Sequence, residues 1–570
     1  SVLLYTDGND VHVVAVNVLM LIDHVGLSAK SNLLHVLTGN VLHVRVRQFV
    51  VRMRIEGDMH HRILRAASVW NEVEKKENTI YEAQYSAYII NFSSQIDAIS
   101  RKISNFAAKI VIVMSQKLEI TNFGPVKQAS IVVTPALILI GQQASGKSTI
   151  AKLIYFFQSL STEFFSRFYQ SDKESVDRTY DLIIPIREKF YDFFGSTFHL
   201  PDFQIVYHYD ENRTLTLSLT SKKRINALFS DDFFTQEDYN ELRGYKRMLL
   251  QLKTELESID NVARKVALDE RHLVYLHHLA DKINALFCNN HNDSLFILAG
   301  RNATIGYSET FENMLQQSIQ KNIEEQGHRA FETKEQTIDE TLMLSFMQRV
   351  VKMRQSFINL GNFEGMIKNA NSRLKPKLKL ANKLIHEVLH GQYSNSEFGE
   401  RIVHPGQGYV YLKNASSGQQ ESIRILQDAF LSIYQGNKLL RIVEEPEAHL
   451  FPEAQMATIQ LLVLMLNSSP SGHLILTTHS PYTLTVINNM IYAAKVGTKR
   501  PEQVNEIIPK ELWLPLENVS AYILQNGEAV DIIDPELGEI KAELIDEISN
   551  VINNQYDQLL QLDDSDGTED

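Results

Sequence analysis

The sequence predicts an α/β fold, in which a mixed sheet is flanked by helices and interrupted by a helical insertion. Three observations predict it. Pro135–Ile140 is a short, continuous apolar run, typical of a strand buried on both faces of a sheet, and it leads directly into a glycine-rich loop and a helix. Apolar strands recur within residues 439–447 and 471–480. Between these regions, Glu237–Phe287 changes to helical spacing.

Length and composition indicate an ordinary soluble protein. The 570 residues, 44% of them hydrophobic, are enough for about three domains. The single cysteine, Cys288, excludes an intramolecular disulfide framework and a Cys-cluster metal site, and we expect it to serve packing. The apolar run Val13–Ile22 is about half a membrane span, and acidic Asp7 and Asp10 precede it. We therefore expect a cytoplasmic protein without a membrane anchor.

The net charge of −13 argues against a protein coated in nucleic acid, but it leaves a local basic groove open. Charge alone therefore does not decide whether DNA is bound.

Changes in pattern along the chain predict the domain boundaries. Residues 1–113, including a polar, helical-looking stretch at Ser68–Asn105, carry no motif, whereas Lys117–Pro125 begins as an alternating strand and ends in a turn. Phe203–Leu219 alternates with a period of two around a turn at Asp210–Arg213, and we expect its strands to form a second, small sheet. The predicted domains are an N-terminal extension of unassigned role (1–113), an N-terminal head lobe (114–230), a helical insertion (231–395), a C-terminal head lobe (396–556) and an acidic tail (557–570).

The predicted helices lie mainly in the insertion. Glu237–Phe287 reads either as a projecting helical hairpin or as an ordinary globular helix pair, because its apolar repeat does not keep strict heptads. Its apolar stripe comprises Leu249, Leu252, Leu256, Ile259, Val262 and Val266. Further helices are expected at Ser148–Phe157, Glu309–Leu360 and Asn371–Leu389.

The glycine-rich loop predicts a nucleotide site. Gly141–Ser148 satisfies the phosphate-binding pattern G-x-x-x-x-G-K-[ST] between a strand and a helix, so its backbone N–H groups, from Gly141 through Ala144, Ser145 and Gly146, are expected to cradle the phosphates of ATP. Lys147 would neutralise the β- and γ-phosphate oxygens. The Ser148 hydroxyl would bind Mg²⁺, and Thr149 would assist at the α-phosphate.

Two later strand ends supply candidate catalytic groups. The strand at Leu439 ends in carboxylates, as expected where a P-loop fold brings acids beside the metal. Glu444 would hold Mg²⁺ through water, and Glu445 would orient and deprotonate the attacking water. The strand within residues 471–480 delivers His479 at its end, where the ring would bond the γ-phosphate or that water.

One loop extends the pattern to a known family. Lys413–Glu421 lies one helix before the acidic strand and resembles the Leu-Ser-Gly-Gly-Gln signature of ABC-type ATPases, with Ser416, Gly418 and Gln419 at matching positions and Ser417 in place of the first glycine. In that family the signature grips the γ-phosphate of ATP held by the opposite head. The resemblance therefore implies a homodimer of heads, or a higher oligomer, with two ATP molecules sandwiched between them.

Other motifs narrow the resemblance. Glu444–Pro452 is similar to the acidic motif of OLD-like ATPases. Phe296–Asn302 is similar to an Ala-Gly-Arg element that these ATPases carry after their insertion, and Phe123-Gly-Pro is similar to their opening strand. OLD nucleases add a C-terminal Toprim domain, for which the roughly ninety residues after His479 are too few. The chain then resembles the standalone ATPase subunits of anti-phage systems such as Septu (PtuA, including retron-associated forms), slightly more than PARIS (AriA).

Several functions remain open. The leading hypothesis is a defence ATPase, not itself a nuclease, that holds and licenses a separate nuclease or toxin; DNA or retron multicopy single-stranded DNA would be a further partner. The second is a DNA-repair ATPase of the SMC-like or RecF-like type that clamps DNA directly. A transporter ATPase fits poorly because the acidic motif and insertion differ, and a non-hydrolysing scaffold is the fourth.

Some residues favour structural readings. His60 and His61 lack metal-ligand spacing, so we interpret them as surface or packing residues. Asp531 and Asp534 are expected to cap a turn. Arg301 could reach a phosphate, but an arginine in a glycine turn is more often a structural donor.

Overall fold

The computed structural model describes residues 2–7, 10–15, 43–47, 50–52, 116–171, 182–258, 262–306, 338–406, 408–541 and 554–559. The chain divides into two compact units, Ser1–Met114 and Ser115–Asp570. In the first, four strands form an antiparallel sheet: β1 (Val2–Asp7), β2 (Asp10–Ala15), β3 (His43–Arg47) and β4 (Val50–Arg52). The expectations for Ser68–Asn105, for His60 and His61, and for the last eleven residues of the acidic tail lie outside the described residues.

The second unit is organised around one sheet of eleven strands. Their order is β10 (Ile225–Phe229), β9 (Thr214–Leu219), β8 (Gln204–His208), β5 (Gln116–Phe123), β6 (Val126–Val133), β18 (Glu528–Asp531), β17 (Val519–Gln525), β7 (Ala136–Gly141), β16 (His473–Thr478), β15 (Leu439–Glu444) and β11 (Asp293–Ile297). The expectation of a separate small sheet for Phe203–Leu219 is wrong. Because β5 pairs with β6 on one side and β8 on the other, the hydrogen-bond ladder is continuous.

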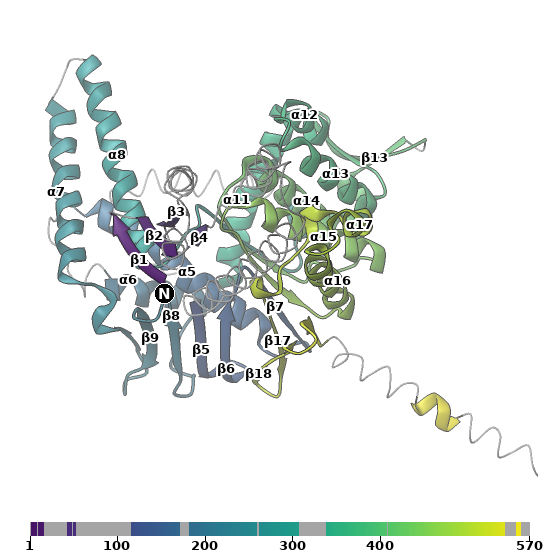
Figure 1. Cartoon of the computed structure of the whole chain (residues 1–570), viewed down its shortest axis with the longest axis horizontal. Helices are drawn as coiled ribbons and strands as arrows, with labels where there is room; N and C mark the ends of the chain where they lie inside the picture. Colours follow the sequence, from purple (N-terminus) through teal and green to yellow (C-terminus); the bar gives the residue numbers. More distant parts are fainter. Residues whose placement is uncertain are drawn as a thin grey trace, which may run out of the picture. The chain divides into compact units, whose positions relative to one another are not determined.

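The parallel part of this sheet brings together distant parts of the chain. Strands β17, β7, β16, β15 and β11 run parallel, so their carboxyl ends share one edge. In Figure 1 the yellow strand β17 accordingly lies beside β7, from an early part of the chain. The glycine loop and both predicted catalytic strand ends therefore meet at this edge.

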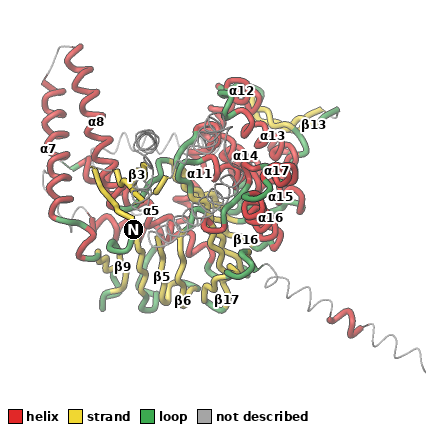
Figure 2. Tube along the Cα trace, in the orientation of Figure 1, coloured by secondary structure: helices red, strands yellow, loops and turns green. Residues whose placement is uncertain are grey.

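Alternating side chains of β7 enter two different cores, which explains why the run at 136–140 is apolar throughout. Leu137 and Leu139 pack with helix α5 (Lys147–Gln170), while Ile138 and Ile140 belong to the core under the C-terminal helices. Figure 2 shows helices gathered against the yellow strands. Helix α5 is longer than predicted, because Leu160, Phe164 and Phe168 continue its buried face beyond Phe157.

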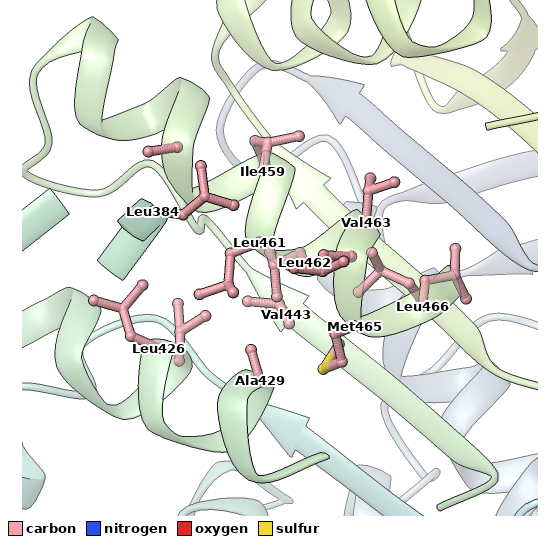
Figure 3. Packing of buried hydrophobic residues seen from close by; sticks show 14 of the residues in the cluster. Leu384, Leu426, Ala429, Val443, Ile459, Leu461, Leu462, Val463, Met465 and Leu466 are labelled. Atoms are coloured by element: carbon pink, nitrogen blue, oxygen red, sulfur yellow. The ribbon is translucent and has the colours of Figure 1, made fainter. Parts of the chain in front are cut away.

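The C-terminal core is built mainly by four helices. These are α13 (Lys375–Leu389), α14 (Ser417–Gln435), α15 (Pro452–Ser468) and α16 (Pro481–Gly497). Figure 3 shows Leu384 of α13, Leu426 and Ala429 of α14, and Val443 of β15 packed around α15. The short helix α17 (Pro501–Ile507) and the ribbon β19–β20 (Ile533–Asp534, Glu539–Ile540) complete this region.

Residues 231–395, predicted to be one helical insertion, form a helical pair and a separate helical block, but between the two, β11 belongs to the central sheet of the head. Helices α7 (Gln236–Ser258) and α8 (Val262–Leu286) pair and project from the head (Figure 1). Of the predicted stripe, Leu249 and Leu252 are buried but Val266 is 53% exposed, because the far end of a two-helix hairpin has no third layer to cover it. The remaining elements are α6 (Ile184–Phe194), α9 (Ala303–Gly306), α11 (Ile338–Asn359), α12 (Asn362–Asn369) and the small sheet β12 (Gln392–Ser396), β13 (Gly399–His404) and β14 (Gly408–Tyr411). Residues 309–337 of the predicted helical block lie outside the described residues.

Candidate active site

The glycine loop is shaped by close backbone approaches. A Cβ atom on Gly141 would lie 2.4 Å from the Leu524 carbonyl oxygen, and one on Gly146 would lie 2.6 Å from a methyl group of Val126. Gly146 also has φ = 106°, a conformation that L side chains rarely adopt. Both glycines of the pattern are therefore required by the fold, and between them Ala144 takes a left-handed φ of 59°.

The loop ends where a long helix begins, which makes its N–H groups an anion site. Helix α5 starts at Lys147 and runs for 24 residues, with Ser148 and Thr149 in its first turn. Lys147 is 5% exposed, and its ammonium donates to the carbonyl oxygens of Gly141 and Gln142, at 2.9 and 2.8 Å. Burial lowers the pKa of Lys147, while the carboxylates of Glu445, Glu447 and Glu444 act to raise it.

The acidic strand end presents two differently held carboxylates. Glu444 is buried, and its Oε2 accepts a hydrogen bond from the Ala299 amide at 3.3 Å. Its Oε1 is buried without a hydrogen-bond partner among the described residues. Glu445 is more open, with a side chain 39% exposed, and has the left-handed φ of 44°. Its amide donates to the Thr477 carbonyl at 2.8 Å, which holds this strained residue beside β16.

His479 lies beside Glu445, as expected from two neighbouring strand ends. Its Nε2 is 3.2 Å from Glu445 Oε1. Glu447 fixes the backbone at His479. Its Oε1 accepts hydrogen bonds from the Thr478 hydroxyl at 2.6 Å and from the His479 amide at 2.7 Å. Sequence reasoning assigned no role to Glu447, although a third carboxylate two residues after Glu445 was visible in the motif.

The signature-like loop forms the N-terminus of α14. The Ser416 hydroxyl accepts from the Gln419 amide, and the Gln419 side chain accepts from the Ser416 amide, so the two residues form a capping box. Gly418 packs against the acidic motif, and a Cβ atom there would lie 2.6 Å from the His449 carbonyl oxygen. Ser416 and Ser417 are exposed. The loop therefore combines a solvent-facing helix start with a close contact to the turn after Glu445.

Arg301 takes the structural role favoured from the sequence. Its guanidinium is fully buried and donates to four carbonyl oxygens, those of Leu298, Glu421, Glu444 and Glu445, at 2.8–3.0 Å. These acceptors belong to its own turn, to α14 and to the acidic strand end. Arg301 thus fastens the signature helix to the two carboxylate-bearing residues.

These residues fit ATP and Mg²⁺ chemically. The unsatisfied Glu444 Oε1 and the buried, unpartnered Ser145 hydroxyl are polar atoms that a hydrated cation and a phosphate would satisfy. Among the described residues no group of three His, Cys, Asp or Glu side chains could hold a metal alone. Mg²⁺ commonly takes few protein ligands and uses phosphate oxygens and water for the rest, so Ser148 and Glu444 would hold it together with ATP.

Three sequence predictions concern features away from this edge of the sheet. Asp531 accepts from the Ile533 amide, and Asp534 accepts from the amides of Glu536 and Leu537, so both cap turns as predicted. Cys288 is buried, and burial raises the pKa of its thiol to about 12, which leaves it a packing residue. No helix in the described part of the chain has the length and apolarity that a membrane crossing requires.

A phosphate-binding loop, an acidic strand end and a histidine strand end on one edge of a mixed sheet define a P-loop ATPase of the ABC-like type. The comparisons agree. The chain belongs to the AAA ATPase domain family, whose sequence pattern matches residues 114–484. No curated protein matches it.

Similar solved structures include two SMC head domains and the recombination mediator protein RecF. An Smc head bound to the C-terminal winged-helix domain of ScpA is 10% identical, with 74% of this chain and 98% of that chain covered and a TM-score of 0.32. The SMC head domain from Thermotoga maritima is 11% identical, with 73% and 98% covered and a TM-score of 0.29. The recombination mediator RecF is 12% identical, with 73% and 98% covered and a TM-score of 0.23.

Proposed function

We propose that this ATPase works as paired heads that hydrolyse ATP to control a separate nuclease or toxin in anti-phage defence. The observation that carries the pairing is the exposed start of α14, with Ser416 and Ser417 facing solvent beside the acidic turn. A helix start of this kind offers N–H groups and a positive dipole end to a phosphate. In the paired arrangement, that phosphate belongs to ATP on the other head.

Exposed aromatic residues beside the acidic and histidine motifs support the same arrangement. Phe451, just after the acidic motif, is 74% exposed, and Tyr482, three residues after His479, is 53% exposed. Large apolar side chains are costly to leave in water and are enriched in the centres of interfaces. A second head placed over this edge would cover them.

The chemistry divides among named residues. Lys147 and the loop amides bind and neutralise the phosphates, and bound Mg²⁺ supplies further charge neutralisation. Glu445 accepts the proton of the attacking water. His479, aligned by Glu447, sits within hydrogen-bond distance of Glu445 and can orient the carboxylate or donate to the γ-phosphate. Phosphoryl transfer needs mainly this positioning, so a small set of side chains is sufficient.

Paired heads can be tested by sedimentation velocity of Glu445→Gln, which should trap ATP. We expect a dimer with ATP and Mg²⁺ and a smaller species without them. Ser417→Arg, which places a bulky cation at the exposed helix start, should leave ATP binding intact and abolish dimer formation. A Glu445→Gln protein that remains monomeric with saturating ATP would refute the pairing.

The link to an effector rests on the resemblance to standalone defence ATPases and is tested separately. The full chain would be purified from its native host with nucleic acid retained, as wild type and as Glu445→Gln, and the mass of the complex measured. A stoichiometric nuclease or toxin is expected. Degradation of DNA by the chain alone with Mg²⁺ or Mn²⁺ would contradict the proposed division of labour.

The projecting pair α7–α8 favours a second candidate, a repair ATPase that clamps duplex DNA between its heads. The longer helix has 25 residues and spans about 37 Å, which suits a short arm rather than a long tether. This candidate predicts tight, salt-sensitive duplex binding that requires ATP and no partner protein. Recovery of the chain alone as an ATP-dependent dimer on DNA would favour it over the defence role.

A further inference from the structure

Helices α12 and α13 carry a concentration of positive charge in an acidic protein. Between Glu364 and Glu387 the chain has six basic residues and no acidic one, whereas its net charge is −13. They are Lys368, Arg373, Lys375, Lys377, Lys379 and Lys383. A local excess of positive charge on a protein of negative net charge marks a surface that attracts negatively charged ligands.

The fold aligns three of these lysines on the outer face of α13. Leu378, Ala381 and Ile385 face the core, while Lys379 and Lys383 are exposed on the other side. Half-buried Lys375, whose ammonium donates to the Lys368 carbonyl at 3.3 Å, precedes them at the same four-residue spacing. The row extends over about 12 Å of helix. Its one acidic contact among the described residues joins Lys383 to Glu387 at 3.7 Å, with the lysine 73% exposed, and such pairs contribute little.

The neighbouring small sheet presents aromatic rings to solvent. Tyr409 and Tyr411 lie on the same face of β14 and are 51% and 38% exposed, with ring centroids 5.5 Å apart. Arg401 pairs with Tyr411 in register, and its guanidinium lies 4.7 Å from the centre of the Tyr409 ring. Arg401 thus covers one face of Tyr409, and the exposed parts of the two rings, which meet edge to face at 89°, remain open for stacking.

The end of α13 lies against the small sheet that carries the rings. His390, which follows the helix, has its carbonyl oxygen 3.0 Å from Nδ1 of His404 at the end of β13. The preceding residue, Val403, pairs with Tyr409. Strand β12, which follows α13 in the chain, contacts that helix and pairs with β13. We call the set Lys375, Lys379, Lys383, Arg401, Tyr409 and Tyr411 the lysine–tyrosine surface.

We propose that the lysine–tyrosine surface binds single-stranded nucleic acid. Lysines contact phosphates without regard to sequence, and exposed rings stack on unpaired bases, which together are the features of a single-strand site. A duplex keeps its base faces inside the stack and would leave the rings unused. An acidic peptide would engage the lysines alone. The surface lies on one head, so binding needs neither ATP nor pairing, and it does not depend on the proposed defence role.

The test is fluorescence anisotropy of the full chain with a labelled 30-nucleotide oligo-dT strand across a range of salt concentrations. Lys375→Gln/Lys379→Gln/Lys383→Gln should weaken binding at least tenfold and reduce the slope of log affinity against log salt by about 2, since each phosphate contact on a single strand contributes about 0.7. Tyr409→Ala/Tyr411→Ala should weaken binding roughly fivefold or more per ring and leave the slope unchanged.

A matched control removes the same charge elsewhere. Lys222, Lys499 and Lys510 are exposed, and the triple change of these lysines to Gln should bind as wild type. Unchanged ATP turnover and thermal unfolding in the lysine variant would show that its fold is intact. An abasic strand of equal length should bind the tyrosine variant and the wild type equally.

Three outcomes would overturn the proposal. One is wild-type affinity in the lysine variant. Another is tighter binding of a 30-base-pair duplex than of the strand. The third is binding of an acidic peptide with the sequence of residues 563–570 that is tighter than binding of the strand and is lost in the lysine variant. That result would make this a surface for docking a protein or the acidic tail.

Discussion

Replacing Arg301 by methionine should loosen the whole catalytic edge. Methionine keeps the length of the side chain but removes every donor, so the carbonyl oxygens of Leu298, Glu421, Glu444 and Glu445 each lose one hydrogen bond from a cation. At about 1 kcal/mol of net stabilisation for each hydrogen bond lost, the loss is about 4 kcal/mol, and the Glu421 carboxylate, 3.5 Å from the guanidinium, also loses its buried countercharge. A change of this size is exceptional for one side chain and would lower the urea midpoint of unfolding clearly.

The local effect should be visible by hydrogen exchange. The strained φ of Glu445 is held by the hydrogen bond from its amide to the Thr477 carbonyl and by the Arg301 guanidinium, which donates to the Glu445 carbonyl oxygen. The Glu445 amide should therefore exchange faster in Arg301→Met. ATP turnover should fall with it. Arg271→Met, at an exposed position on α8, is the matched control and should change neither property. A variant that unfolds within about 1 kcal/mol of wild type and keeps its turnover would refute the role assigned to Arg301.

Further predictions concern the acid, the signature loop and pH. Glu445→Gln should retain ATP binding, measured with a fluorescent analogue, and lose at least a hundredfold in hydrolysis, because a positioned base contributes about 10²–10⁴ in rate. Gly418→Ala should lower the thermal midpoint, because its Cβ would lie 2.6 Å from the His449 carbonyl oxygen, an overlap costing about 1–3 kcal/mol. Burial lowers the pKa of His473 to about 4. Since the unfolded histidine takes up its proton near pH 6.5 and the folded one does not, stability should fall by about 3 kcal/mol from pH 6.5 to 4, and His473→Gln should flatten that slope.

Each of these three tests has a matched control. Glu257→Gln changes an exposed carboxylate near the end of α7 and should hydrolyse ATP normally. Gly244→Ala adds a methyl group inside α7 where nothing lies within 4 Å, so it should not destabilise the protein. His386→Gln, on the exposed side of α13, should leave the pH dependence of stability unchanged. A pH profile of His473→Gln as steep as wild type would assign the loss to other groups, such as the buried neighbour His291.

The sequence predicted those parts of the fold that depend on local pattern. Strand β7, the start of α5 and strand β15 are each a short periodic segment next to a distinctive loop, so their type and the order of the chemistry were readable. The pairing of β5 with β8 was not, because the partner of a strand is set by contacts between distant residues. This is why the predicted separate sheet was wrong.

The candidate site was likewise predictable only where it depends on local sequence pattern. The motifs predicted that Glu445 and His479 each end a strand and act on the attacking water, and the structure pairs these strands and places the two side chains 3.2 Å apart. The supporting contacts of Glu447 and Arg301 depend on where backbone amides and carbonyls point, which no periodicity encodes. The roles predicted for the nucleotide, metal and signature residues remain predictions until ligand binding is measured.

The close packing of Gly418 on the turn after Glu445 has a mechanical consequence for paired heads. In the proposed arrangement, α14 of one head contacts the nucleotide of the other, whereas Glu445 serves the nucleotide of its own head. With a backbone-to-backbone contact at Gly418 and Arg301 bridging α14 to the acidic strand, these two parts cannot slide independently. Each head then moves as one rigid body between the two nucleotides. Hydrolysis at one nucleotide therefore changes how the signature loop of that head contacts the nucleotide of the other.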